Sequence, residues 1–298
     1  MTVFIYPNLN KPNSLLCTEQ ACGVLLSEEC RVFMDKKFEE VFGSSKGIIY
    51  RTTEECVSDC NVIVVTGGDG TILRCAGLAS KYGKPILGIN CGTLGFMASL
   101  EISEIFKLRL LCRGEYTVSE RMMLSVTVRH SDGTVSTADA LNDAVLIKGE
   151  ECKLADFEVM KSGSVVSALR ADGVIFSTAT GATAYSLSAG GPIIEPDLQC
   201  IEFSQVCAHT LFSRTIVFSP ESLLTVKCHC AEGTHVTLNV DGVLLAKLTA
   251  HDTVEIKRSA LKTRIIDLTG GSFFQTVNSK LMTPLKPQDR SDKERYGK

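Results

Sequence analysis

The first hundred residues alternate between short apolar runs and longer segments with helical spacing. Three runs rich in β-branched residues are typical of buried strands, and they cover residues 3–6, 62–66 and 85–90. Residues 14–42 carry helix-like apolar spacing that Gly23 interrupts, and residues 71–82 form a second helical segment. Strands that alternate with helices predict a parallel sheet with helices on its faces, so we expect a Rossmann-like α/β domain.

After a helix-like segment at residues 102–112 the pattern changes to a series of strands. The predicted strands cover residues 123–128, 145–148, 157–161, 165–169, 174–177, 215–218, 223–229, 235–240, 243–248 and 253–257. Glycine-containing turns separate them, so a largely all-β domain is expected to follow the α/β domain, with a boundary near residues 111–117. A short final helix is predicted at 273–282.

The charge balance and the apolar runs exclude two kinds of partner. The chain has 298 residues, with 31 Lys and Arg against 34 Asp and Glu, so its formal net charge of −3 gives no general attraction for nucleic acid or anionic lipid. The apolar runs are far shorter than the roughly 20 residues that span a bilayer. We therefore expect neither a nucleic-acid partner nor a membrane partner.

The 13 cysteines are interpreted as reduced thiols. The first residues, MTVFIYP, lack the basic and apolar segments of a secretory signal, so we expect a cytoplasmic protein. Cys228-His229-Cys230 resembles a metal ligand set, but the alternation of Val226 and Cys228 with polar neighbours favours one buried face of a strand over a zinc site.

The strongest local signal is the segment TGGDGT at residues 66–71. It follows a β-branched strand and opens a helix, so backbone N–H groups at the helix N-terminus are expected to bind phosphate. It is neither the dinucleotide fingerprint nor a P-loop, because no Gly-Lys-Ser/Thr follows. A carboxylate in such a loop repels phosphate unless a metal or a proton-transfer role compensates for the like charge. Asp69 is therefore a candidate general base. The alternative is that Asp69 only caps the helix.

Two further segments carry candidate ligand-binding groups. In Asn142-Asp143 an amide beside a carboxylate can bind an adenine edge and a ribose diol, although such pairs also open ordinary turns. Residues 177–192, STATGATAYSLSAGGP, are small and rich in hydroxyl groups, which fits a loop that lines a ligand pocket. Tyr185 is predicted to stack on a base or, alternatively, to pack in the core.

Together these segments resemble the NAD kinases. GGDGT at 67–71, LGIN at 87–90, GTLGF at 92–96 and LND at 141–143 occur in that family's order. Asp172-Gly173, residues 178–191, HTL at 209–211 with Arg214, and Asp241-Gly242 continue it over nearly the whole chain. The glycine segment alone is shared with diacylglycerol-type lipid kinases, whereas the TGATAY block is particular to NAD kinases.

The resemblance implies a domain organisation. Residues 1–113 would form the α/β domain, residues 114–262 a β-sandwich domain that binds NAD, and residues 263–285 a segment that returns to the first domain. The polar tail at 286–298 is expected to be disordered. The site would lie between the domains, and the resemblance also implies a homodimer or homotetramer.

The resemblance also implies roles for individual residues. Asp69 would act on the 2′-hydroxyl of the adenosine ribose of NAD. The residues that bind phosphate and ATP would be Gly67, Gly68, Gly70, Thr71 and Asn90. The residues that bind NAD would be Phe96, Asn142, Asp143, Arg170, Asp172, Thr180, Thr183, Ala184, Tyr185 and Ser188. A basic residue at the position of Arg170 is associated with a preference for NAD over NADH. Asp143 stands where the family commonly has Glu, which shortens its reach.

The implied reaction is phosphoryl transfer from ATP to NAD, giving NADP and ADP. Because the glycine segment has no Lys, the negative phosphates are expected to need Mg²⁺ and backbone donors. The Mg²⁺ is expected to come with ATP, without direct protein ligands. No organic prosthetic group is expected. Two alternatives are a lipid kinase of the same layout, which the lack of a basic amphipathic face disfavours, and a non-catalytic NAD sensor, which Asp69 disfavours.

Overall fold

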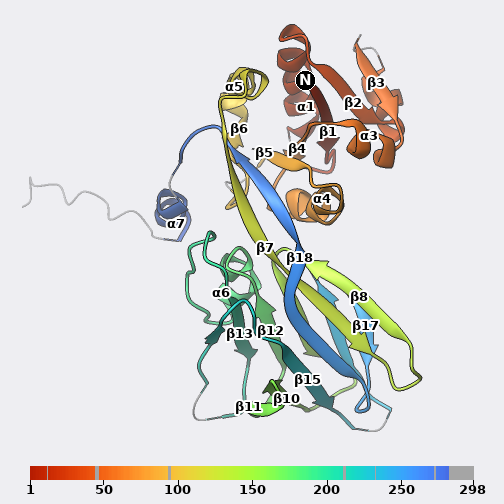
Figure 1. Cartoon of the computed structure of the whole chain (residues 1–298), viewed down its shortest axis with the longest axis vertical. Coiled ribbons are helices and arrows are strands. Elements are labelled where there is room, and N and C mark those ends of the chain that lie inside the picture. Colours follow the sequence, from red (N-terminus) through yellow and green to blue (C-terminus); the bar gives the residue numbers. More distant parts are fainter. Residues whose placement is uncertain are drawn as a thin grey trace, which may run out of the picture.

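The computed structural model describes residues 1–11, 13–43, 47–92, 95–210, 213–231, 233–271 and 273–281. These residues form two domains stacked end to end. The long strands β7 (Thr117–Arg129) and β18 (Thr253–Asp267) pair with each other and run from one domain into the other (Figure 1). The predicted fold class, an α/β domain joined to a β-sandwich domain, is confirmed.

The N-terminal domain is built on a parallel sheet with the strand order β3–β2–β1–β4–β5. Its strands are β1 (Thr2–Pro7), β2 (Arg31–Asp35), β3 (Ile48–Arg51), β4 (Val62–Gly67) and β5 (Pro85–Asn90). The strand order reverses between β1 and β4, and open α/β sheets bind ligands beside such a point, at the carboxyl ends of the strands. The glycine segment follows β4 directly.

Helices cover both faces of this sheet, which is why its strands are apolar on both sides. One face packs against α1 (Ser14–Ser27) and α5 (Leu108–Arg113), and the other packs against α3 (Thr53–Asp59) and α4 (Asp69–Lys81). Each face therefore has its own buried core. The buried start of α4 fixes the glycine turn against the sheet, since Thr71 and Ile72 are each 1% exposed.

The prediction of helical structure across residues 14–42 is wrong in part. α1 passes through Gly23 without interruption, and β2 follows it. A 3₁₀ turn (Lys36–Phe38) and the four-residue helix α2 (Glu39–Phe42) then complete the range. The buried run Val32, Phe33 and Met34 is too short for its periodicity to distinguish a strand from a helix. The four-residue strand β3 is a further element that the pattern did not predict.

The C-terminal domain is a sandwich of two antiparallel sheets. One sheet has the order β14–β13–β12–β9–β16–β17, and the other contains β8, β7, β18, β15, β10 and β11. The strands are β8 (Val135–Ala140), β9 (Asp143–Lys148), β10 (Ala155–Lys161), β11 (Ser164–Ala171), β12 (Gly173–Ser177), β13 (Ile201–Val206), β14 (Ile216–Phe218), β15 (Leu224–His229), β16 (Val236–Val240) and β17 (Val243–Leu248). Phe157, Phe176 and Phe203 lie in the core between the sheets.

The predicted strands of this domain are confirmed, and two more are present. β8 and β13 did not stand out, and β13 escapes prediction because the buried Glu202 and Ser204 interrupt its apolar run. Cys228 lies on the buried face of β15, as the alternation predicted. Within the described residues no group of three His, Cys, Asp or Glu side chains is placed to hold a metal ion.

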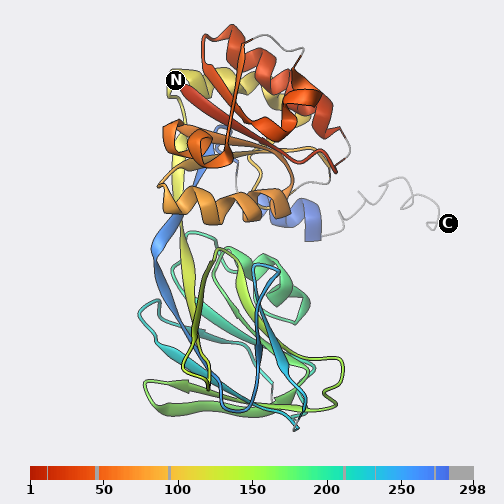
Figure 2. The same ribbon diagram turned by 90° about the vertical axis from the view of Figure 1, so that its right-hand side faces the viewer.

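β18 links the two domains through its two ends. Its first part pairs with β7 and β15, whereas Arg264 and Ile265 pair in parallel with Pro85 and Ile86 of β5. The short β6 (Leu100–Glu101) also pairs with β5. α7 (Phe273–Leu281) follows β18 and lies beside the junction of the domains (Figure 2).

The last residues of the chain lie beyond the part that is described. These are residue 282, the predicted end of the final helix, and the tail at 286–298 that was expected to be disordered. Among the described residues, no helix has the length and apolar character needed to cross a lipid bilayer.

Candidate active site

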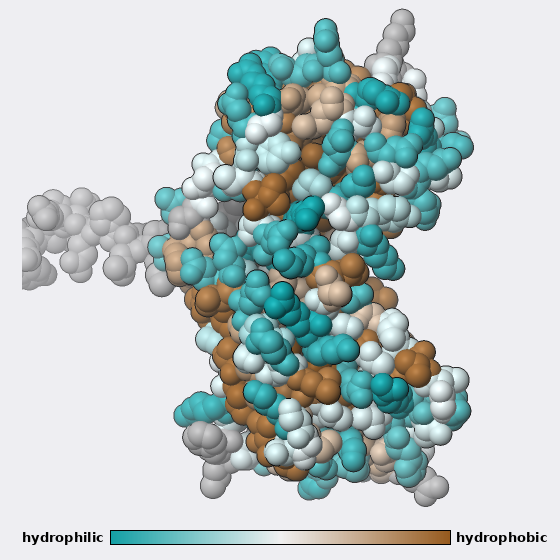
Figure 3. All heavy atoms as spheres, in the orientation of Figure 1, coloured by the Kyte–Doolittle hydropathy of each residue, from teal (hydrophilic) through white to brown (hydrophobic). Residues whose placement is uncertain are grey.

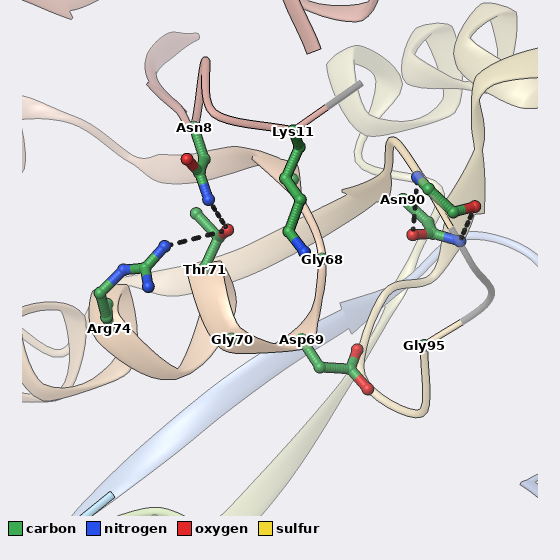
Figure 4. A pocket seen from close by; sticks show the side chains of 11 residues that line it. Asn8, Lys11, Gly68, Asp69, Gly70, Thr71, Arg74, Asn90 and Gly95 are labelled. Carbon is green, nitrogen blue, oxygen red and sulfur yellow. Dashed lines mark hydrogen bonds between the residues drawn. The ribbon is translucent and has the colours of Figure 1, made fainter. Parts of the chain in front are cut away.

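The glycine segment forms a cavity at the carboxyl edge of the parallel sheet. β4 ends at Gly67 and α4 begins at Asp69, and a cavity of about 280 Å³ opens at this turn (Figure 4). The first N–H groups of a helix have no partner within the helix and carry partial positive charge, so they are suited to bind phosphate. We call it the phosphate cavity, because all the predicted phosphate-binding residues line it: Gly67, Gly68, Gly70, Thr71 and Asn90.

The Asp69 carboxylate faces the loop that follows β5. Its Oδ2 accepts a hydrogen bond from the Phe96 N–H at 2.6 Å, and its Oδ1 accepts one from the Met97 N–H at 3.1 Å. A Cβ atom at Gly95 would overlap the carboxylate, so glycine lets this loop approach it. The alternative that Asp69 only caps α4 is wrong, because Gly68 is the N-cap residue and no side chain caps the helix.

Two cations that the sequence analysis did not single out line the same cavity. Lys11 follows the end of β1 and extends toward Gly68, while Arg74 lies in the second turn of α4 (Figure 4). Asn8 Nδ2 donates to Thr71 Oγ1 at 2.9 Å, and Arg74 Nη2 donates to the same oxygen at 3.5 Å. The protein therefore supplies positive charge next to the glycine turn, although the glycine segment itself has none.

Asn90, at the end of β5, is the predicted ATP-site residue outside the glycine segment. Its side chain is buried and bonds to its own loop: Nδ2 donates to the Gly92 carbonyl at 3.3 Å and to Glu101 Oε1 at 3.1 Å, and Oδ1 accepts from the Gly92 N–H at 3.3 Å. The Asn90 amide thus shapes the cavity wall between β5 and the following loop. It lines the phosphate cavity with its polar groups already in use.

Asn142 and Asp143 lie at the start of β9 and are 8% and 7% exposed. Asn142 Oδ1 is buried and has no hydrogen-bond partner among the described residues, which leaves an acceptor for a ligand N–H group. Burial, together with the charge of Asp241, raises the pKa of the Asp143 carboxyl to about 7. An amide acceptor beside a carboxyl group is the arrangement that the sequence predicted for adenine and ribose.

The hydroxyl-rich segment wraps around Asn142. The Thr178 N–H donates to the Asn142 carbonyl at 2.9 Å, and a Cβ atom at Gly181 would overlap that same carbonyl. After a 3₁₀ turn at Gly181–Thr183 the helix α6 (Tyr185–Ser188) begins. Tyr185 is 38% exposed, so the alternative that it packs in the core is wrong.

A second cavity, of about 460 Å³, lies between the domains. It brings together three predicted NAD-binding residues, Phe96 of the N-terminal domain and Thr180 and Thr183 of the C-terminal domain. β7, β18 and α7 supply further walls, and the Phe96 ring lies 6.3 Å from the Phe273 ring between centroids. At this level the molecule narrows to a waist with hydrophilic side chains on the visible face (Figure 3).

Asp172, with Arg170 two residues before it, lies at the opposite end of the β9–β12 pair from Asp143. In the pairing of β9 with β12, Asp143 faces Ser177 at one end and Ile147 faces Gly173 at the other, next to Asp172. The two ends are on the order of 13 Å apart at 3.3 Å per residue. Arg170 makes a bidentate ion pair with Asp156 at 2.7 and 2.9 Å, and Lys148 pairs with Asp172 at 2.6 Å.

The fold and the site define a two-domain protein, α/β and β-sandwich, with a glycine turn suited to phosphate and a carboxylate beside it. Residues 3–116 match the ATP-NAD kinase N-terminal domain, and residues 141–268 match the ATP-NAD kinase C-terminal domain. The NAD kinase of Caldanaerobacter subterraneus subsp. tengcongensis is 35% identical over 94% of this chain and 98% of the relative. The NAD kinase of Citrifermentans bemidjiense is 32% identical over 94% and 97%. The chain therefore belongs to the NAD kinase family.

Two solved structures share the fold. The yeast NADH kinase complexed with NADH has a TM-score of 0.87 at 23% identity, and covers 96% of this chain and 89% of that one. An NAD kinase from Archaeoglobus fulgidus in complex with ATP has a TM-score of 0.69 at 22% identity, and covers 94% and 98%.

Proposed function

We propose that the chain transfers the γ-phosphoryl group of ATP to the 2′-hydroxyl of the adenosine ribose of NAD, giving NADP and ADP. Phosphorylation of NAD is the activity of the family to which the chain belongs. One observation carries the proposal at the level of residues. Asp69 lines the phosphate cavity, while Phe96 and Met97, whose N–H groups hold its carboxylate, line the cavity between the domains.

Asp69 is the general base of this proposal. A ribose hydroxyl is a poor nucleophile at neutral pH, so a carboxylate that takes its proton as the oxygen–phosphorus bond forms contributes roughly 100-fold to 10,000-fold. The γ-phosphorus gains the ribose oxygen and loses the bond to ADP, which leaves with the electron pair. The backbone N–H groups of Phe96 and Met97 fix the direction of the carboxylate before the substrate binds.

The donor side of the site binds the phosphates of ATP. Lys11, Arg74 and the N–H groups at the start of α4 face the cavity where the phosphates would lie. This cationic, donor-rich lining fits ATP that carries its own Mg²⁺, and the ion supplies further neutralisation of the charge that is transferred. We propose no set of protein side chains as its ligands.

On the acceptor side, the buried side-chain oxygen of Asn142 (Oδ1) would accept a hydrogen bond from the amino group of adenine. The Asp143 carboxylate would accept hydroxyl protons of the ribose, and the exposed Tyr185 ring would cover the dinucleotide. This assignment explains why a polar side chain with an unused acceptor is buried at the start of β9.

The direct test is incubation of purified protein with NAD, ATP and Mg²⁺, with NADP read by an NADP-specific dehydrogenase. Wild-type protein is expected to make NADP, and Asp69→Asn to lose nearly all turnover while retaining NAD binding. Near wild-type activity in Asp69→Asn would reject the general base. Binding of NAD without turnover for any donor would favour a sensor, and turnover of lipids alone would favour a lipid kinase.

The separation of Arg170 and Asp172 from Asn142 bears on the expected homodimer or homotetramer. We propose that these two residues reach NAD that is bound to another copy of the chain, because one chain presents the two groups at opposite ends of β12. Complementation tests this. Co-expressed Asp69→Asn and Asp172→Ala chains are expected to regain activity that neither variant has alone, because a mixed oligomer contains one intact site. Oligomers that gain nothing on mixing, or a monomer in solution, would contradict it.

A further inference from the structure

Asp241 organises the backbone from which Asn142 and Asp143 project. Its Oδ2 accepts the Leu141 N–H at 2.8 Å, and its Oδ1 accepts the N–H groups of Asn142 at 2.8 Å and Asp143 at 3.1 Å. The Asp241 N–H in turn donates to the Asp143 carbonyl at 3.0 Å. One side chain from a distant hairpin therefore satisfies three successive backbone donors.

The carbonyl side of the same segment is fixed by β12 and the residue after it. The Thr178 hydroxyl donates to the Leu141 carbonyl at 2.5 Å, and the Ser177 hydroxyl donates to the Asn142 carbonyl at 3.2 Å. With N–H and C=O groups both engaged, Asn142 has little freedom except in its side chain. Its amide oxygen nevertheless stays without a partner among the described residues, which is the state expected of a pre-positioned ligand acceptor.

The turn that carries Asp241 explains how it reaches this place. Asp241 and Gly242 connect β16 to β17 with φ values of 49° and 78°. A two-residue hairpin of this kind requires left-handed residues, and both Asp-Gly and Asn-Gly are favoured there. Asn could thus hold the turn as well as Asp does. What Asn cannot supply is a second acceptor oxygen and a negative charge.

We propose that Asp241 is a positioning residue for the dinucleotide, which sets the backbone geometry of Asn142 and Asp143 and holds a carboxylate against the Asp143 N–H. The inference rests on the proposed NAD-binding role of these two residues. Burial is the larger cause of the raised pKa of the Asp143 carboxyl, and the charge of Asp241 adds to it. Burial also raises the pKa of Asp241, which the three backbone N–H groups offset in part. Since only the ionised Asp143 accepts both hydroxyl protons of a ribose diol, the pair couples NAD affinity to pH.

The test compares the Kd for NAD of wild-type protein and Asp241→Asn at pH 6 and pH 8, in the absence of ATP. Asp241→Asn keeps the turn, so the variant is expected to fold. At pH 8 its Kd should rise by about tenfold or more, the usual cost of a lost hydrogen bond to a charged group, with the KM for ATP unchanged. Wild-type protein should bind NAD more weakly at pH 6 than at pH 8. Asp241→Asn should show a smaller difference, because burial of Asp143, the larger cause of its raised pKa, remains when the charge of Asp241 is removed.

Two controls separate positioning from general stability. Asp252→Asn is the matched variant, because the buried Asp252 carboxylate also accepts backbone N–H groups, those of Ser131 at 2.9 Å and Thr249 at 2.7 Å, at the opposite end of β17. It should leave the Kd for NAD unchanged at both pH values. Asp241→Glu keeps the charge but displaces it, so it should weaken binding and keep the pH difference.

The outcomes separate this inference from the proposed reaction. Suppose that Asp241→Asn binds NAD with the same Kd as wild-type protein at both pH values, while wild-type protein makes NADP. This result overturns the role of Asp241 and leaves the proposed reaction intact. An equal rise of Kd at both pH values, matched by Asp252→Asn, also overturns it, because a purely structural loss has that signature. Protein that binds NAD and makes no NADP contradicts the reaction, and the Kd values still test Asp241.

Discussion

Asp69 and Phe96 are joined by a 2.6 Å hydrogen bond from the Phe96 N–H to the carboxylate, across 27 residues of sequence. The bond connects the helix after β4 to the loop after β5, two neighbouring strands of the parallel sheet. The residue that would accept the proton is thus fixed by the same loop that presents Phe96 to the cavity between the domains. In the proposed reaction, the position of the Asp69 carboxylate therefore depends on how closely that loop approaches α4.

Gly95→Ala is expected to lower kcat strongly while the protein stays folded. The new Cβ atom would overlap the Asp69 carboxylate, so the carboxylate or the loop must move. A displacement of about 1 Å at a reacting group costs on the order of 100-fold in rate. Steady-state kinetics with NAD and ATP would measure the loss, and circular dichroism would show that the fold is intact.

Gly77→Ala is the control for this prediction. Gly77 lies in α4, the helix that begins at Asp69, and a Cβ atom there would meet no heavy atom of the described residues within 4 Å. Its kcat should equal that of wild-type protein, with a small gain in stability from the better helix former. If Gly95→Ala kept full activity, the close approach of the loop to Asp69 would have no catalytic importance.

Arg74→Gln and Lys11→Gln are expected to raise the KM for ATP and leave the KM for NAD unchanged. Both side chains line the phosphate cavity, whereas neither lines the cavity between the domains. Loss of one charge-assisted hydrogen bond to phosphate costs about 1.5–3 kcal/mol, or roughly 10-fold to 100-fold in affinity. Lys81→Gln, at the exposed end of the same helix, is the matched loss of charge and should change neither constant. An equal rise of both KM values would argue that Arg74 and Lys11 act on the fold of the site rather than on ATP.

The parts of the site that lie in continuous sequence were predictable. The β-branched run before the glycines is buried at every position from Val62 to Gly67, and the helix that follows begins within two residues of its predicted start. Local pattern determines both, because apolar periodicity and glycine placement act over a few residues. The burial of Asn142 beside Asp143 is likewise compatible with the roles expected for them.

The parts that depend on strand order were not predictable. Lys11 reaches the glycine turn because β1 pairs with β4, and no local signal at residue 11 states which strands will be neighbours. The same holds for Asp241, which comes to Asn142 through the pairing of β16 with β9. The separation of Asp172 from Asp143 also depends on strand pairing, because β12 runs antiparallel to β9 and carries Gly173, next to Asp172, to the end opposite Asp143.

Glu202 is expected to make the protein less stable as the pH rises. Its carboxyl group is fully buried; Ser186 donates to it at 2.5 Å and Ser204 at 3.0 Å, and Oε2 has no partner among the described residues. Burial raises its pKa, which the two hydroxyl groups offset in part. A carboxyl whose pKa is raised by folding contributes its full stability below its ordinary pKa and loses that contribution as the pH rises through the folded value.

Glu202→Gln removes the titrating group and keeps its shape. The free energy of unfolding in urea should therefore fall less between pH 5 and pH 8 for Glu202→Gln than for wild-type protein. The exposed Glu221 offers a control, since Glu221→Gln should not change this pH dependence. A difference between wild type and Glu202→Gln that is the same at both pH values would show that Glu202 stays ionised, or neutral, throughout the range.

Cys207 provides a probe for the part of the site that contains Asp172, which the resemblance to NAD kinases places near the nicotinamide end of NAD. All 13 cysteines are free thiols, and Cys207 is the exposed one. Cys207 lies beside Asp172: a hydrogen bond from Lys148 lowers the pKa of the Asp172 carboxyl, and a hydrogen bond from Cys207 lowers it less strongly. The cytoplasmic location, where such thiols stay reduced, remains a prediction. Because buried thiols react slowly, an aromatic disulfide reagent should label Cys207 first in the folded protein.

Saturating NAD should slow this labelling several-fold, whereas ATP alone should not, because Asp172 is assigned to NAD and not to the donor. Cys207→Ser should remove the fast phase and leave NADP formation largely intact, which identifies the reacting thiol. The absorbance of the released thiolate, followed at rising NAD concentration, gives a half-maximal protection that should match the Kd for NAD. Labelling that proceeds at the same rate with NAD bound would place the nicotinamide away from Asp172 and would remove both Asp172 and Arg170 from the site.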